Sequence, residues 1–196
     1  MKQVSAESIL LPLQQLQQSH DEIAHRDILS FDLYKRLKHM VLHFYKYAGK
    51  IESARVERDF LQFRKVLVDT FIICMASANA MNVSLGESIQ EEAEAPNLDA
   101  LARELGKTMP TKDLFVEALH SMLVLGGQMA KAIESADHME RGDPRATMEI
   151  LISRLTVVIL GILGHLDGHL DAEVRGRLHS IEQKSIFYRT TRSGDL

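Results

Sequence analysis

The sequence contains little cysteine and proline and no tryptophan. Its single cysteine, Cys74, excludes an internal disulfide and lies in an apolar run, so we expect a buried thiol in a reducing, cytoplasmic compartment. Only 4 prolines and 11 glycines interrupt the chain, and the alternation of apolar and polar residues that marks half-buried strands is nearly absent. The formal net charge of −4 gives no strong signal for nucleic-acid binding.

The sequence also shows no pattern typical of a targeting or membrane segment. The N-terminal stretch lacks the continuous apolar core and small-residue cleavage site of a signal peptide. The charge-free run at 70–86 is shorter than the ~20 residues that cross a bilayer. We therefore expect a cytoplasmic protein without a membrane partner.

Apolar residues recur with helical periodicity along most of the chain. This periodicity predicts an all-α helical bundle of about six to seven helices. The expected helices span 5–19, 27–55, 56–82, 97–105, 112–141, 145–166 and 170–188. Asp27 or Ser30 is expected to cap the second of these. An acidic, solvated linker leads into the short fourth helix, and a polar tail follows the last.

Two segments of the sequence resemble each other. AGKIESAR at 48–55 and AKAIESAD at 130–137 share five residues at matched spacing, and each precedes a helix that is apolar on most sides. The match predicts one domain, 1–196, with an internal duplication: a first unit at about 26–86, a linker with a short helix at 87–110, and a second unit at 111–190. Two helix pairs then form a four-helix core. A chance match is the alternative.

The run Lys65–Leu85, KVLVDTFIICMASANAMNVSL, carries a single acid within an apolar helix. That acid is Asp69. A buried carboxylate costs free energy unless a cation, a metal or a helix N-terminus lies beside it. The identity of this partner is therefore the main functional question that the sequence raises.

The pattern YAGKIESA followed by DTFIICMASANAMNVSL resembles the MazG-like all-α nucleotide pyrophosphohydrolases, over about 33–85 and more weakly over 114–189. The resemblance implies a helical bundle, often paired as a homodimer. It also implies acids of an E-E-x-x-E helix and an E-x-x-D helix that hold Mg²⁺, through which a nucleoside triphosphate is cleaved between its α and β phosphates. Acids at these spacings share one helix face, and their oxygens suit Mg²⁺.

The acidic positions of that family pattern are mostly replaced here. Aligned on Gly49, they are occupied by Lys46, Tyr47, Lys50, Val66 and Asp69, so that one acid remains. If the protein is catalytic, we expect Asp69 together with Glu52 or Glu57 to hold Mg²⁺, with Asp69 and Glu52 as the catalytic candidates. The resemblance places Lys46, Lys50, Arg177 and Lys184 where phosphate contacts are expected. Alternatively, Lys46 or Lys50 forms an ion pair with Asp69 in place of the metal.

Two pairs of histidines are further metal candidates. His39 and His43 share a helix face, and so do His165 and His169 if their helix continues. Two histidines alone do not complete a zinc site, which needs three or four ligands. A half-exposed polar face is the alternative for the first pair, and a turn at Gly164 and Gly168 is the alternative for the second.

Two functions follow from the sequence. The first is a MazG-like nucleotide-handling protein that has lost most Mg²⁺-binding acids, which leaves its activity open; if active, it is a nucleoside triphosphate pyrophosphohydrolase. The second is a non-enzymatic helical-bundle protein with an interaction or regulatory role. In both cases the apolar helices at 66–81 and 150–163 favour a homodimer.

Overall fold

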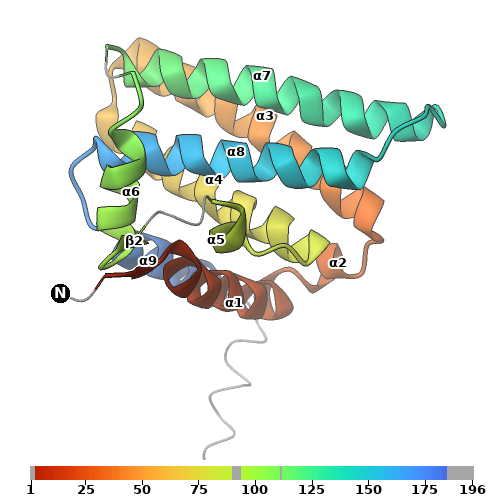
Figure 1. Cartoon of the computed structure of the whole chain (residues 1–196), viewed down its shortest axis with the longest axis horizontal. Helices are drawn as coiled ribbons and strands as arrows, with labels where there is room; N and C mark the ends of the chain where they lie inside the picture. Colours follow the sequence, from red (N-terminus) through yellow and green to blue (C-terminus); the bar gives the residue numbers. More distant parts are fainter. Residues whose placement is uncertain (1–2, 90–93, 111, 185–196) are drawn as a thin grey trace, which may run out of the picture.

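The computed structural model describes residues 3–89, 94–110 and 112–184 (Figure 1). Within these residues the protein is an all-α bundle of nine helices, with one pair of two-residue strands. The predicted fold class is confirmed. Two of the helices, α2 (Arg26–Leu29) and α5 (Leu85–Ser88), are single turns, and the other seven match the expected set.

Four long helices form the core. They are α3 (Leu33–Glu57), α4 (Phe60–Met81), α7 (Leu114–Asp137) and α8 (Pro144–Gly164). Helix α3 packs against α4 and α7, and α8 packs against the same two helices, so the four close a ring (Figure 1). The pairs α3–α4 and α7–α8 have closely similar lengths, while the internal duplication that they suggest stays a prediction.

Helix α4 lies at the centre because its sequence is apolar on nearly every side. Asp59 caps its first turn by accepting a hydrogen bond from the Gln62 N–H, and Asn82 ends it in the left-handed conformation with φ of 57°. Phe63 and Phe71 are completely buried. Burial of each such side chain stabilises the fold by roughly 1.5–3 kcal/mol.

Helix α8 is the second apolar core helix. Asp143 caps it, and Pro144 occupies its first turn. Proline suits this position because it has no backbone N–H to leave unpaired and its φ is fixed near the helical value. Within the described residues, it alone has the length and composition of a membrane span, but 61% of its most apolar stretch is buried in the bundle. Core helices of globular proteins have the same composition, so the absence of a membrane partner stays a prediction.

Helices α1 (Ala6–Ala24) and α9 (Leu170–Glu182) cover the side of the core formed by α4 (Figure 1). A buried network of amides attaches α1: the Gln14 side chain donates to Asn79 Oδ1 and to the Val83 carbonyl, each at 2.9 Å, and accepts from the Leu85 N–H at 2.9 Å. These bonds fix the position of α1 over the end of α4.

An ion pair attaches α9. Arg64 of α4 is 11% exposed and donates from Nε to both carboxylate oxygens of Glu173 at 3.0 Å. Its Nη1 donates to the carbonyls of Leu163 and Leu166 at the end of α8. Gly168, with φ of +151°, passes so close to this guanidinium that a Cβ there would collide with it. The start of α9 is thus held against α4 and α8.

The segment expected as a solvated linker is partly buried. Ile89 and Ala95 are only 2% and 3% exposed, and β2 (Glu94–Ala95) pairs antiparallel with β1 (Val4–Ser5). The short helix that follows, α6 (Leu98–Gly106), packs on α8 so closely that a Cβ on Gly164 would collide with the α6 backbone. The expectation of a solvated linker was therefore wrong for the described part, because apolar residues within it reach the core.

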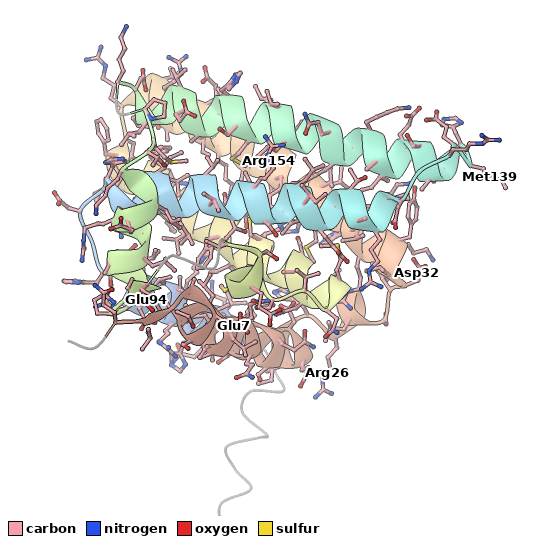
Figure 2. The ribbon with its side chains drawn as sticks, viewed as in Figure 1. Glu7, Arg26, Asp32, Glu94, Met139 and Arg154 are labelled. Carbon is pink, nitrogen blue, oxygen red and sulfur yellow. The ribbon has the colours of Figure 1, made fainter. Side chains whose placement is uncertain are left out.

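Helix boundaries also differ from the expectation. Neither Asp27 nor Ser30 begins α3, because Asp32 caps it by accepting from the Lys35 N–H at 2.9 Å. Charged side chains such as those of Arg26, Asp32 and Glu94 are exposed on the outside of the bundle (Figure 2). Helix α9 ends at Glu182, and the predicted continuation to 188 and the polar tail lie largely outside the described residues.

Candidate functional site

A cavity of about 200 Å³ lies where α1, α3, α4 and α9 meet. Four histidines, two aspartates, a tyrosine and an arginine face it: His20, His25, His39, His43, Asp21, Asp69, Tyr47 and Arg177. Four other grooves have larger volumes, about 590, 490, 270 and 360 Å³, but none of them is lined by as many ionisable side chains. Clusters of buried ionisable groups in a cavity are typical of functional sites.

Asp69 is paired by Arg177 of α9. Arg177 Nε donates to Asp69 Oδ1 at 2.6 Å, and Nη2 donates to Oδ2 at 3.0 Å. The Asp69 side chain is 9% exposed and the Arg177 side chain 32%. The hydrogen bond to Asp69 raises the pKa of Arg177 above its usual range. A two-point guanidinium–carboxylate pair is the strong form of ion pair, so the buried acid has its partner in Arg177, and neither Lys46 nor Lys50 takes that role.

The surroundings of Asp69 do not fit Mg²⁺. Both carboxylate oxygens accept from Arg177, and three of the positions where the resemblance led us to expect acids are Val66, Lys46 and Lys50, which offer no oxygen ligand. Mg²⁺ requires near-octahedral oxygen coordination. Binding of Mg²⁺ at Asp69 would first require Arg177 to leave.

Two lysines follow one face of α3 next to the cavity. Lys46 Nζ lies 4.5 Å from the ring centroid of Tyr47, and Lys50 Nζ lies 5.6 Å from it. Lys46 also donates to His43 Nδ1 at 2.9 Å. Burial, and then the positive charge of Lys50, lower the pKa of Lys46. Burial, followed by the charge of Asp69, raises the pKa of Tyr47 to about 12, so this phenol is neutral.

His39 and His43 meet inside the cavity, as their spacing predicts. Their Nε2 atoms are 3.1 Å apart and their ring centroids 4.6 Å apart. Burial, with the nearby charge of Lys46, lowers the pKa of His43 to about 4. His43 is therefore neutral at pH 7, and one imidazole of the pair donates to the other.

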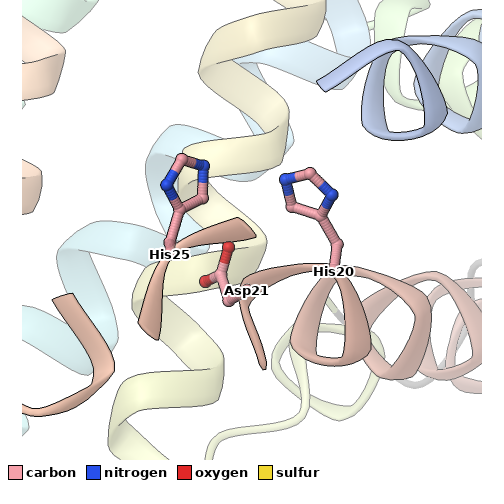
Figure 3. Close-up of side chains that lie close together, drawn as sticks. All are labelled: His20, Asp21 and His25. Atoms are coloured by element: carbon pink, nitrogen blue, oxygen red, sulfur yellow. The ribbon is translucent and has the colours of Figure 1, made fainter. Parts of the chain in front are cut away.

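His20, Asp21 and His25 form a second cluster that lines the same cavity, and sequence reasoning missed it (Figure 3). One ligand atom from each of the three lies within 4.8 Å of the other two. On a continuous helix His20 and His25 would point about 140° apart. They meet because α1 ends at Ala24 and His25 departs from helical geometry, with φ of −134° and ψ of 41°. The stretch HDEIAH was the only sequence signal for this cluster.

The remaining predicted residues lie elsewhere. Glu52 is bound on the surface by Arg55 at 2.7 Å, a hydrogen bond that lowers the pKa of Glu52, and it is not among the residues that line the cavity. Lys184 is exposed just beyond α9. His165 bonds the Gly106 carbonyl at 2.8 Å, and the His169 N–H donates to Glu173, so the turn predicted as the alternative for this pair is what forms.

Comparison with known proteins gives no match to any protein family, curated protein or solved structure.

Proposed function

We propose that the protein binds a nucleotide, or a similar phosphate-bearing small molecule, at the rim of the cavity and does not hydrolyse it with Mg²⁺. The basic rim consists of Lys46, Lys50 and Arg177 around the Tyr47 ring. Phosphates are bound in proteins by lysine and arginine side chains that carry uncompensated positive charge.

The observation that carries the proposal is the balance of charge at this rim. Asp69 is the acid at the centre of the rim, and Arg177 neutralises it. Within the described residues, neither Lys46 nor Lys50 forms an ion pair with a carboxylate. Two neighbouring ammonium groups that repel each other are stabilised when an anion binds between them.

The size of the cavity limits how much of the ligand enters. Pockets that enclose a whole drug-sized ligand have volumes of roughly 300–1,000 Å³, whereas this cavity has about 200 Å³. The phosphate end of the ligand therefore lies at the rim, and a sugar and base remain outside, over α3. Such a mode recognises phosphate more strongly than the base.

Thermal stabilisation by a panel of nucleoside triphosphates, with and without Mg²⁺, tests the proposal alongside an assay for released pyrophosphate. We expect a rise in Tm with ATP that does not need Mg²⁺, and no pyrophosphate. The double variant Lys46→Ala/Lys50→Ala should lose most of this rise. Lys131→Ala, which removes an exposed lysine of α7, is the matched control and should keep it.

Two outcomes overturn the proposal. Pyrophosphate release that requires Mg²⁺ and disappears in Asp69→Ala would establish the pyrophosphohydrolase instead. Absence of both binding and turnover would favour the interaction protein.

An exposed apolar surface on α7 and α8 is the observation that favours pairing of two copies. Val124 of α7 and Ile150 of α8 are 44% and 61% exposed, and they border two grooves that share Arg154 and Val157. Exposed apolar surface of this kind marks interfaces between proteins. The homodimer expected from the sequence is therefore proposed to form across the α7–α8 face.

A further inference from the structure

We propose that His20, Asp21 and His25 bind a divalent transition-metal ion, a site that uses none of the basic-rim residues. Two imidazole nitrogens and a carboxylate oxygen suit borderline ions such as Zn²⁺, Co²⁺ and Fe²⁺, rather than Mg²⁺ or Ca²⁺, which prefer oxygen ligands. The proposal therefore differs from the Mg²⁺ site that the sequence led us to expect at Asp69, both in its residues and in its metal.

The spacing of the three donors is close to that of a bound ion. Metal–ligand bonds of roughly 2.0–2.2 Å in a tetrahedral site place neighbouring ligand atoms about 3.3–3.6 Å apart. The three donors lie within 4.8 Å of one another, so the site must contract by about 1 Å. His25 lies between α1 and α2 outside regular helix, and a shift of this residue supplies that contraction.

The orientation of the His20 ring is fixed by a hydrogen bond to Glu182. Its Nδ1 lies 3.2 Å from Glu182 Oε1 on α9. The other ring nitrogen of His20 points toward His25, and the Asp21 carboxylate lies between the two rings (Figure 3). A carboxylate that holds the far nitrogen of a ligand histidine selects the tautomer whose free nitrogen faces the metal, and raises its basicity.

The burial of Asp21 is a second, independent observation. Asp21 is 8% exposed, and within the described residues no ion pair is formed by its carboxylate. An unpaired buried carboxylate is costly, and a bound cation would remove this cost. Asp69 is already paired with Arg177, whereas Asp21 forms no ion pair within the described residues.

Three protein ligands leave one coordination position open. His20, Asp21 and His25 all line the cavity, which is also lined by His39 and His43. A zinc site with three protein ligands and one open position normally holds water there.

Calorimetric titration of Zn²⁺ into the full chain, freed of metal with a chelator, tests the site, and the visible spectrum of the Co²⁺ form reports its geometry. We expect one ion per chain and a tetrahedral Co²⁺ spectrum. His25→Ala should abolish both. Glu182→Gln, which leaves the three ligands in place, should weaken Zn²⁺ binding by about 10–100-fold. The controls Asp27→Asn and His138→Gln, both exposed and outside the cavity, should bind Zn²⁺ as the wild type does.

Absence of stoichiometric Zn²⁺ binding by the wild type would overturn the inference. So would Zn²⁺ binding that His25→Ala and Glu182→Gln leave unchanged while their helical circular dichroism matches the wild type. His25 is only partly buried, which makes its replacement less disruptive than that of His20. The readout does not involve nucleotide, so failure here leaves the proposed function standing.

Discussion

Arg177 of α9 holds Asp69 of α4 by two hydrogen bonds, at 2.6 and 3.0 Å, across a separation of 108 residues. This ion pair joins the peripheral helix α9 to the core. It also occupies both oxygens of Asp69, the one acid left at the positions where the resemblance led us to expect acids. It also leaves Lys46 and Lys50 as the uncompensated charges next to it. The stability of the bundle and the chemistry of its cavity therefore depend on the same pair.

Arg177→Ala should destabilise the protein by about 3–5 kcal/mol, because it leaves the carboxylate of Asp69 buried without a partner. Asp69→Leu combined with Arg177→Met should cost much less, since neither charge then remains. Urea denaturation measures both free energies of unfolding.

Arg175→Ala is the matched control on the same helix. Its pair with Asp171 is exposed, with side-chain exposures of 50% and 43%, so the loss should stay below about 1 kcal/mol. If Arg175→Ala and Arg177→Ala lower the free energy of unfolding equally, the Asp69–Arg177 pair stabilises the protein no more than an exposed ion pair does.

Gln14→Ala should lower the free energy of unfolding by about 3 kcal/mol. The change removes the partners of the Leu85 N–H and of Asn79 Oδ1, and each buried polar group left unpaired costs roughly 1–3 kcal/mol. Gln15→Ala alters the neighbouring exposed residue and should stay within about 0.5 kcal/mol of wild type. If the two variants have the same urea midpoint, the amide network does not hold α1.

Stability should fall as the pH drops from about 6.5 toward 4, in part because of His43. Burial lowers the pKa of His43 in the folded protein to about 4, so between these values the unfolded chain binds the proton and the folded protein does not. The contribution of His43 to the free energy of unfolding is therefore fully present above pH 6.5 and is lost progressively as the pH falls toward 4. Half-burial limits its size to about 1–2 kcal/mol.

His43→Gln isolates this contribution. Its free energy of unfolding, measured with chelator between pH 7 and 4.5, should decline less steeply than that of the wild type. His138→Gln, at an exposed position, should decline as steeply as the wild type. A His43→Gln curve parallel to the wild type would contradict the assignment.

Replacing Val124 or Ile150 with lysine should convert a dimer into a monomer, because a charge placed in an apolar interface must lose its hydration. Light scattering after size exclusion measures the mass. Met139→Lys, at a residue 92% exposed on the α7–α8 connection, should leave the mass unchanged (Figure 2). A wild-type protein that remains monomeric at every concentration would rule out this interface.

The sequence was sufficient to predict what local periodicity determines. The apolar run around Asp69 predicted α4 nearly to its observed ends, and the need of Asp69 for a buried partner followed from the cost of an isolated charge. The identity of that partner did not follow. Arg177 lies 108 residues away, and only the packing of α9 on α4 brings it to Asp69.

The histidine cluster illustrates the same limit. His39 and His43 were predictable as neighbours because four residues make about one helical turn. His20 and His25 are five residues apart and meet only because α1 ends between them. Similarly, the burial of Ile89 and Ala95 was not predicted, because they lie in an acidic segment whose average composition resembles that of a linker. Such features depend on where helices stop and on which distant surface they reach.

Calorimetric titration of ATP into the metal-free wild-type protein, in the presence of chelator, tests the central claim most directly. The basic rim contains its own cations, so we predict saturable binding of one ATP per chain without any divalent ion. Binding should weaken at high salt, as contacts between phosphate and exposed lysines do. If ATP binds only when Mg²⁺ is supplied, or does not bind at all, the proposed function is contradicted.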